Sequence, residues 1–178
     1  APTDRDLDLV LSGIAQAFSG RRHESVPAPL ETPLARLLSV RETDLNVLQI
    51  GLSVGSVTAR QRVLGQVLDT STVIQDRVAM IRSLGETGVE ASIHPLLGLL
   101  ASDEPATVQS AILSAVGYFG DPGVADHVLA VFSGMPDSVQ ARAIELLCSR
   151  STWALKLLEA VDKKQIQSAR IPLIQLRQ

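Results

Sequence analysis

A sequence motif of about ten residues, called the repeated phrase, occurs four times in this chain at a nearly constant spacing. In its clearest copy, residues 108–117, apolar and small residues recur three and four positions apart, which places them on one face of an α-helix. The other copies begin at Asp44, Asp76 and Val139, so successive copies start 31 or 32 residues apart. A phrase repeated at this period is typical of folds built from stacked supersecondary units. The expected core positions are Val47, Leu48, Gly51 and Leu52; Ala79, Met80, Ser83, Leu84 and Gly85; Val108, Ala111, Ile112, Ala115 and Val116; and Val139, Ala143, Leu146 and Leu147.

The composition of the chain agrees with a core in which helices pack closely through aliphatic side chains. Hydrophobic residues make up 46% of the sequence but aromatic residues only 3%, so the core must consist of Leu, Val, Ile and Ala. Small side chains let helices approach to about 8–10 Å. The net charge of −3 and the scarcity of aromatic residues argue against nucleic acid as a partner. Because no apolar run reaches the roughly 18 residues that span a bilayer, we expect no direct membrane insertion.

The pattern between the copies predicts further helices that alternate with the repeated one. Loops of about two to six residues would join them as antiparallel pairs. We therefore predict an all-α fold, an alpha-alpha superhelix that forms a right-handed solenoid of roughly five stacked antiparallel helix pairs in a single domain of residues 1–178. Residues 1–30 would form an N-terminal cap helix and loop, residues 31–161 the repeats, and residues 162–178 a C-terminal tail.

Several local features of these helices are expected from the sequence. Thr32, Thr43 and Ser151 are candidate N-caps, and Gly85 is a candidate C-cap glycine. Pro33 would occupy the first turn of the helix that follows Thr32. The first helix, residues 4–18, would bury a stripe of Leu7, Val10, Leu11, Ile14 and Phe18, and further expected buried residues are Leu34, Leu37, Leu38, Val63, Leu64, Val67, Leu68, Trp153, Leu157, Leu158, Leu173, Ile174 and Leu176.

The repeated unit resembles HEAT-like repeats. The resemblance rests on the period, on the turn at residues 102–105, and on the phrase Val-x-x-Ala-x-x-x-x-Val-Gly that begins at Val108. It covers about residues 31–161. It implies a helical repeat fold that serves a binding role, and it implies no particular reaction.

The two ends carry a narrower resemblance. Residues 9–22 (LVLSGIAQAFSGRR) look like the entry to a helical segment of large planctomycete-type exported proteins, and residues 153–161 (WALKLLEAV) look like its exit. In that family, a propeller-like dehydrogenase domain precedes the segment and a haem-binding cytochrome c domain follows it. The resemblance therefore implies a fragment of a larger redox protein of the membrane-bound dehydrogenase type, which is periplasmic or otherwise exported. Its haem motif, Cys-x-x-Cys-His, is absent from this sequence, so no residue here is expected to bind haem.

No set of residues in the sequence predicts a reaction. His23, His94 and His127 are far apart and lack the Cys or His partners of a zinc site. Cys148 occupies a position where other copies have Gly or Ser, which favours a packing role over a nucleophilic one. We expect no enzyme, no catalytic residue, no metal and no cofactor.

The remaining candidate is the surface that the repeated helices turn away from the core. It would carry Asn46, Ile50 and Ala141 besides the residues that we expect to bind a partner, which are Val78, Arg82, Ser110, Ser114 and Glu145. Arg82 is its one long cation and Glu145 its one long anion, and both would be unpaired. The expected partner is protein, either a neighbouring domain of the same chain or a separate segment. A plain solvated face of a spacer is the alternative.

We consider three alternative hypotheses for the function of this protein. The first is a non-enzymatic scaffold or interaction module. The second is a nucleic-acid-handling HEAT-like protein, for which the sequence lacks a basic ridge. The third is a HEAT-like lyase acting on a bilin chromophore, to which Tyr118, Phe119 and Glu145 could contribute.

Overall fold

The computed structural model describes residues 3–18, 20, 23, 25–168 and 171 of the chain. Throughout these residues the regular secondary structure is helical and no strand occurs, which confirms the all-α prediction. The chain divides into two compact units, Ala1–Ser92 and Ile93–Gln178. None of the helices within the described residues combines the length and the apolar character needed to span a bilayer.

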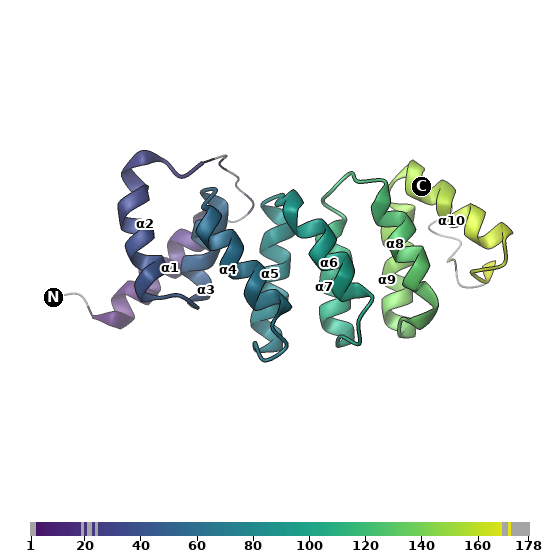
Figure 1. The fold of residues 1–178 in the computed structure, drawn as a ribbon, viewed down its shortest axis with the longest axis horizontal. Coiled ribbons are helices and arrows are strands. Elements are labelled where there is room, and N and C mark those ends of the chain that lie inside the picture. Colours follow the sequence, from purple (N-terminus) through teal and green to yellow (C-terminus); the bar gives the residue numbers. More distant parts are fainter. Residues whose placement is uncertain (1–2, 19, 21–22, 24, 169–170, 172–178) are drawn as a thin grey trace. The chain divides into compact units, whose positions relative to one another are not determined.

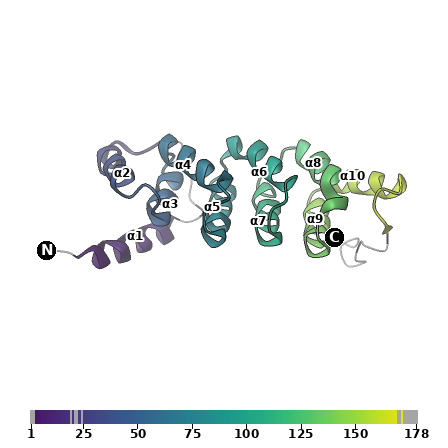
Figure 2. The ribbon, with the colours of Figure 1, turned by 60° about the horizontal axis from the view of Figure 1, so that its bottom comes forward.

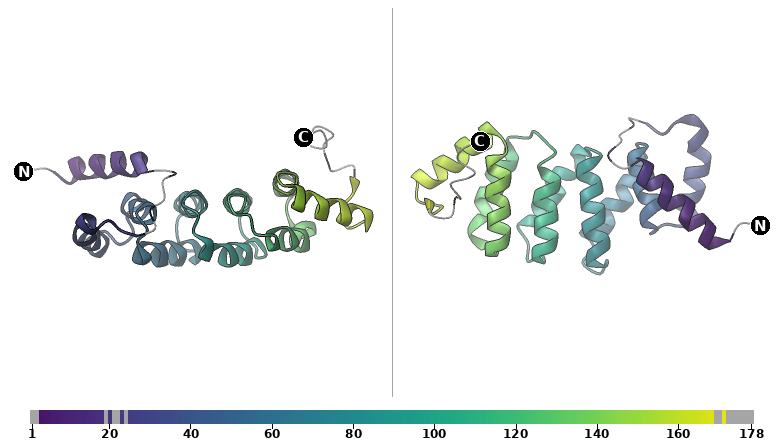
Figure 3. Two further views of the ribbon diagram at one scale, coloured as in Figure 1. Left: turned by 90° about the horizontal axis from the view of Figure 1, so that it is seen from above. Right: turned by 180° about the vertical axis from the view of Figure 1, so that it is seen from behind.

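Within its described residues, the first unit holds five α-helices and one short 3-10 turn (Figure 1). The helix α3 lies at its centre and packs against α1, α2, α4 and α5. The view from behind in Figure 3 shows α1 crossing this part of the unit as a separate outer element. The elements are α1 (Asp4–Phe18), α2 (Ala28–Val40), α3 (Leu45–Ser53), α4 (Val57–Leu68), α5 (Ile74–Glu86) and the turn η1 (Glu90–Ser92).

The core of the first unit follows the predicted repeat positions on α3 and α5. All four expected residues of α3 are buried, as are Met80, Ser83, Leu84 and Gly85 of α5, whereas Ala79 is only partly buried. Gly51 permits the close approach of α3 and α4, because a Cβ atom at this position would lie 2.4 Å from the Cβ atom of Ala59. The small residue at this point of the phrase is therefore required by packing.

The ends of these helices are closed by specific side chains and glycines. Asp44 caps α3 by accepting hydrogen bonds from the backbone N–H groups of Asn46 and Val47, so the prediction of Thr43 was wrong by one residue. Gly85 lies inside α5 and does not end it. The chain leaves that helix through Gly88, which has a positive φ of 63°. A glycine adopts this conformation without the Cβ penalty of other residues.

The start of α2 differs from the prediction. The helix begins four residues before Thr32, with Pro27 at the N-cap and Pro29 in the first turn, so Pro33 lies inside it. The first-turn proline has lost no hydrogen bond because the first N–H groups of a helix have no partner within it. The expected stripe of this helix holds in part, since Leu34 and Leu38 are buried and Leu37 is half-buried.

The predicted stripe of α1 was also partly wrong. Leu11 is buried as expected, but the second buried residue is Ala15. Val10 and Ile14 are exposed, because α1 contacts α3 along only one side of its apolar arc. Likewise, Leu68 at the end of α4 is 47% exposed although Val63 and Val67 are fully buried.

In the described part of the second unit, five α-helices form two layers. In Figure 2, α6, α8 and α10 follow one another on one side, and α7 and α9 lie on the other. Packing between α6 and α8, between α8 and α10, and between α7 and α9 links neighbours within each layer, whereas α6 with α7 and α9 with α10 join the layers. The elements are α6 (Ile93–Leu100), α7 (Ala106–Val116), α8 (Gly123–Val131), the turn η2 (Phe132–Gly134), α9 (Asp137–Cys148) and α10 (Ser151–Asp162).

The core of the second unit confirms most of the predicted positions. Every expected residue of α9 is buried, and on α7 only Ala111 is half-buried, while the unpredicted Leu113 is fully buried. Trp153 is buried at the start of α10, but Leu158 on the same helix is 50% exposed, against expectation. The packing of successive helices against one another in both units bears out the predicted helical repeat fold.

The end of α10 is closed by a motif that also closes α5. The backbone N–H groups of Lys164 and Gln165 donate to the carbonyls of Val161 and Ala160, which leaves Lys164 at a positive φ of 57°. Ser151 is the first residue of this helix and does not cap it, since the N-cap position belongs to Arg150. The predicted contacts of Leu173, Ile174 and Leu176 lie outside the described residues.

Candidate partner-binding surfaces

The five residues expected to bind a partner lie on three helices in two units. Val78 and Arg82 belong to α5 of the first unit. Ser110 and Ser114 belong to α7, and Glu145 to α9, of the second unit. None of the five is buried, so each has a surface that a partner could reach. The structure brings Ser114 and Glu145 together in one cleft, and it places Arg82 in another.

The cleft of the second unit, called the unit 2 cleft below, lies between α7 and α9 and measures about 330 Å³. Gly117 holds the two helices close, because a Cβ atom there would lie 3.0 Å from Cδ1 of Leu146. The lining residues are Leu113, Ser114, Gly117, Tyr118, Arg142, Glu145, Leu146 and Ser149.

The two charged side chains of the unit 2 cleft, Arg142 and Glu145, form an ion pair with each other. Arg142 donates to Oε2 of Glu145 at 2.7 Å and to Oγ of Ser114 at 3.2 Å. The hydroxyl of Ser114 in turn donates to the backbone carbonyl of Ser110 at 2.9 Å. The expectation that Glu145 is unpaired was therefore wrong, and Arg142 is a long cation that the sequence analysis missed. The spacing of three residues between Arg142 and Glu145, typical of helical ion pairs, was the signal that could have revealed it.

An exposed tyrosine borders the same cleft. Tyr118 is 60% exposed, whereas its neighbour Phe119 is buried in the core and does not contribute to the surface. Beside Tyr118, Arg150 donates from Nη2 to the carbonyl of Gly117 at 3.1 Å. Tyrosine and arginine are the side chains most enriched among the residues that dominate protein–protein binding energies.

The cleft of the first unit, called the unit 1 cleft below, measures about 470 Å³ and is bounded by three helices. α3 and α5 provide two sides and α1 provides the third. Arg82 lies here, and among the described residues no ion pair or hydrogen bond joins its side chain. The lining residues are Ser12, Ala15, Gln16, Gly20, Asn46, Gln49, Ser53, Ala79, Arg82, Ser83, Glu86 and Thr87.

α1 packs on α3 at the side of this cleft, but it buries few side chains there. Leu11 and Ala15 are its only buried residues. Arg41, which follows α2, pairs with Asp8 of α1 and, at 3.1 Å, with the capping residue Asp44. The ion pair thus ties the outer helix to the segment between α2 and α3.

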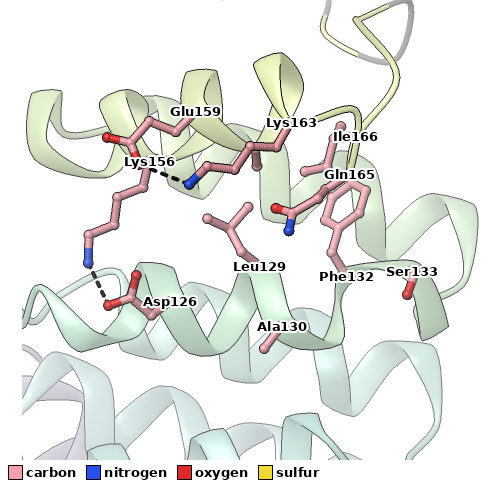
Figure 4. A pocket seen from close by; sticks show the side chains of 11 residues that line it. Asp126, Leu129, Ala130, Phe132, Ser133, Lys156, Glu159, Lys163, Gln165 and Ile166 are labelled. Atoms are coloured by element: carbon pink, nitrogen blue, oxygen red, sulfur yellow. Dashed lines mark hydrogen bonds and ion pairs between the residues drawn. The ribbon is translucent and has the colours of Figure 1, made fainter.

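A third cleft, of about 520 Å³, lies between α8 and α10 (Figure 4). Its floor is apolar and includes Leu129 and Phe132, and its rim is charged. The rim charges are paired: Lys156 with Asp126 at 2.6 Å, and Lys163 with Glu159 at 3.7 Å. The sequence analysis did not predict this cleft, because its residues come from two helices that are not adjacent in the sequence.

The reactive residue types are dispersed. No group of three His, Cys, Asp or Glu side chains within the described residues could hold a metal ion. Burial raises the pKa of the Cys148 thiol, which keeps it protonated at neutral pH and lowers its nucleophilicity. His94 and His127 are both exposed.

Comparison with known proteins gives one match. Neither the curated proteins nor the solved structures contain a match to this chain. Residues 62–148, which include the second, third and fourth copies of the repeated phrase, match the family described as HEAT repeats, a family that generally serves as a protein-interaction scaffold.

Proposed function

We propose that this protein is a non-enzymatic scaffold that binds protein segments through the exposed sides of α5, α7 and α9. The observation that carries the proposal is the HEAT-repeat match over residues 62–148, since members of that family typically act as scaffolds. The clefts on these helices supply contact chemistry suited to a protein partner, with Arg82 in one and Tyr118 beside Arg142 in the other.

We further propose that the partner is a neighbouring domain in a larger exported redox protein. The support for this finer proposal is the resemblance of residues 9–22 and 153–161 to the ends of the helical segment in planctomycete-type exported proteins. Under this proposal residues 31–161 form the repeats, and residues Val78, Arg82, Ser110, Ser114 and Glu145 face the neighbour. The gene that encodes the chain tests it. A dehydrogenase-like region before residue 1 and a Cys-x-x-Cys-His motif after residue 178 are expected, and a gene that encodes neither would contradict it.

Site-specific photocrosslinking in the natural protein tests the scaffold function itself. A photoreactive amino acid replaces Arg82 or Glu145 on the proposed surface, or Val57 or Leu155 on exposed positions of α4 and α10 as controls. The proposal expects discrete crosslinks to one polypeptide, or within the same chain, from Arg82 and Glu145 and none from the controls. Equal crosslinking from all four positions, or none from any, would overturn it.

A further inference from the structure

The unit 1 cleft carries two charged side chains that are one helical turn apart. Arg82 and Glu86 both lie on α5 and both line the cleft. No ion pair of either side chain occurs within the part of the chain that the structure describes. In a helix, a base four residues before an acid is the less favourable order for a mutual pair, so neither charge strongly satisfies the other.

The other polar groups of the cleft are neutral. Asn46 and Gln49 of α3 and Gln16 of α1 offer amide groups that both donate and accept hydrogen bonds. The Gln49 amide already donates to Oγ of Ser83 at 3.1 Å, which leaves its carbonyl oxygen available. Neutral amides of this kind complement the N–H and C=O groups of a peptide backbone.

The spacing of the two charges selects a particular ligand geometry. Four residues of α-helix rise about 6 Å. In an extended peptide, side chains two residues apart point to the same side and lie about 6.6 Å apart. An acidic residue and a basic residue separated by one residue would therefore reach Arg82 and Glu86 at the same time.

We propose that the unit 1 cleft binds an extended segment of acidic-x-basic sequence, with its acid on Arg82 and its base on Glu86. This inference rests on the proposed scaffold function and names the class of segment for one of its surfaces. The neutral amides of α1 and α3 contact the backbone of the segment. The volume of about 470 Å³ is within the range of clefts that hold small ligands and is enough for a few residues.

The test is a titration of the full 178-residue chain, followed by NMR chemical shifts, with peptides blocked at both ends. The probe is Ser-Glu-Ser-Lys-Ser. The matched control peptide, Ser-Glu-Lys-Ser-Ser, has the same composition, but its charged side chains point to opposite sides of an extended chain. We expect the probe to shift resonances of α3 and α5 around the cleft and to bind more tightly than the control. Equal affinities of the two peptides would overturn the proposal.

Charge variants make the test specific to the cleft. Arg82→Glu or Glu86→Arg should each weaken the probe about threefold to tenfold, the range expected when an exposed ion pair is replaced by a repulsion. Arg82→Glu should also gain affinity for Ser-Lys-Ser-Lys-Ser, which a variant that had only lost its fold could not do. Arg36→Glu, at an exposed position of α2 that lines neither cleft, is the matched control and should leave probe binding unchanged.

The outcomes separate this inference from the proposed function. If crosslinking from Arg82 is discrete in the natural protein but the probe and control peptides bind equally, the scaffold function stands and the acidic-x-basic segment is wrong. If Arg82→Glu changes no peptide affinity while its NMR spectrum shows an intact fold, the segment proposal is also wrong.

Discussion

The clefts of the two units contain similar residue types but differ in how their charges are paired. In the unit 2 cleft, Arg142 is held by Glu145 and Ser114, and the remaining lining consists of two leucines and of small residues beside Tyr118. In the unit 1 cleft, Arg82 and Glu86 have no ionic partner among the described residues, and α1 closes a third side. A repeat fold thus produces one cleft whose charges are already satisfied and one whose charges are available to a ligand.

The pairing of charges in each cleft determines whether that cleft can select a ligand by its charge. A charge that is already paired must lose its partner before it can bind another group, so the Arg142–Glu145 pair gives the unit 2 cleft little electrostatic selectivity. The exposed tyrosine is then its main contact group. The unit 1 cleft can select by charge, and its selectivity depends on α1 remaining in place.

The largest expected effect comes from removing the anchor of α1. Leu11→Ala should destabilise the docking of α1 by about 3 kcal/mol, because a buried Leu loses both its apolar contacts and its packing. Hydrogen exchange measured by mass spectrometry should show lost protection confined to α1. Leu9→Ala, at a position 67% exposed, is the control and should change protection little. Unchanged exchange of α1 in Leu11→Ala would show that the unit 1 cleft does not depend on this contact.

The next prediction compares two close helix contacts, the one between α3 and α4 at Gly51 and the one between α7 and α9 at Gly117. Gly51→Ala should cost about 2 kcal/mol, since the new Cβ atom would meet the Cβ atom of Ala59, which cannot rotate away. Gly117→Ala should cost less than about 1 kcal/mol because the nearest atom, Cδ1 of Leu146, ends a flexible side chain. Urea unfolding of both variants measures the two free energies. Equal losses in the free energy of unfolding would mean that the two helix contacts tolerate an added Cβ atom equally well.

A change of opposite sign is expected where the two units end their helices with the same motif. Lys164→Gly should stabilise the protein by about 1 kcal/mol, because it relieves the left-handed conformation of a residue with a Cβ atom. Gly88→Ala, at the matching position after α5, should destabilise by a similar amount. Thermal melts of both variants give the signs. A loss of stability in Lys164→Gly would show that its side chain makes a stabilising contact.

The smallest effect concerns the ion pair of the unit 2 cleft. A double-mutant cycle with Arg142→Ala and Glu145→Ala should give a coupling of about 0.3–0.5 kcal/mol, the usual size for an exposed helical pair. Chemical denaturation at low and high salt measures it, and the coupling should shrink as salt rises. A coupling near zero at low salt would mean that Glu145 is as free as Arg82.

The sequence predicted the helical order and most of the core because both depend on local periodicity. The bounds of α1 agree with the expected range of residues 4–18, and every predicted core position on α9 is buried. How many residues of an apolar helix face are buried was harder to predict. Val10 and Ile14 share the apolar arc of α1 with Leu11, but exposure depends on how far α3 extends beside them, which no local pattern contains.

The candidate sites were predictable only as an exposed face. Periodicity alone placed Arg82 and Glu145 on the outer sides of their helices. It could not show that Arg142 reaches both Glu145 and Ser114, since the second contact joins α9 to α7. Nor could it show that α1 lines the same cleft as Arg82, because the packing of α1 on α3 is a tertiary contact that no local pattern contains.

The most direct test of the account is the mobility of two arginine side chains, measured by ¹⁵N relaxation at Nε in the full-length chain. The central claim is that Arg82 is available to a ligand while Arg142 is held within its own cleft. The account predicts an order parameter below about 0.6 for Arg82 and a clearly higher value for Arg142. It further predicts that the order parameter of Arg82 alone rises when the Ser-Glu-Ser-Lys-Ser peptide is added. Equal order parameters for the two arginines, or a peptide that immobilises Arg142 and not Arg82, would contradict it.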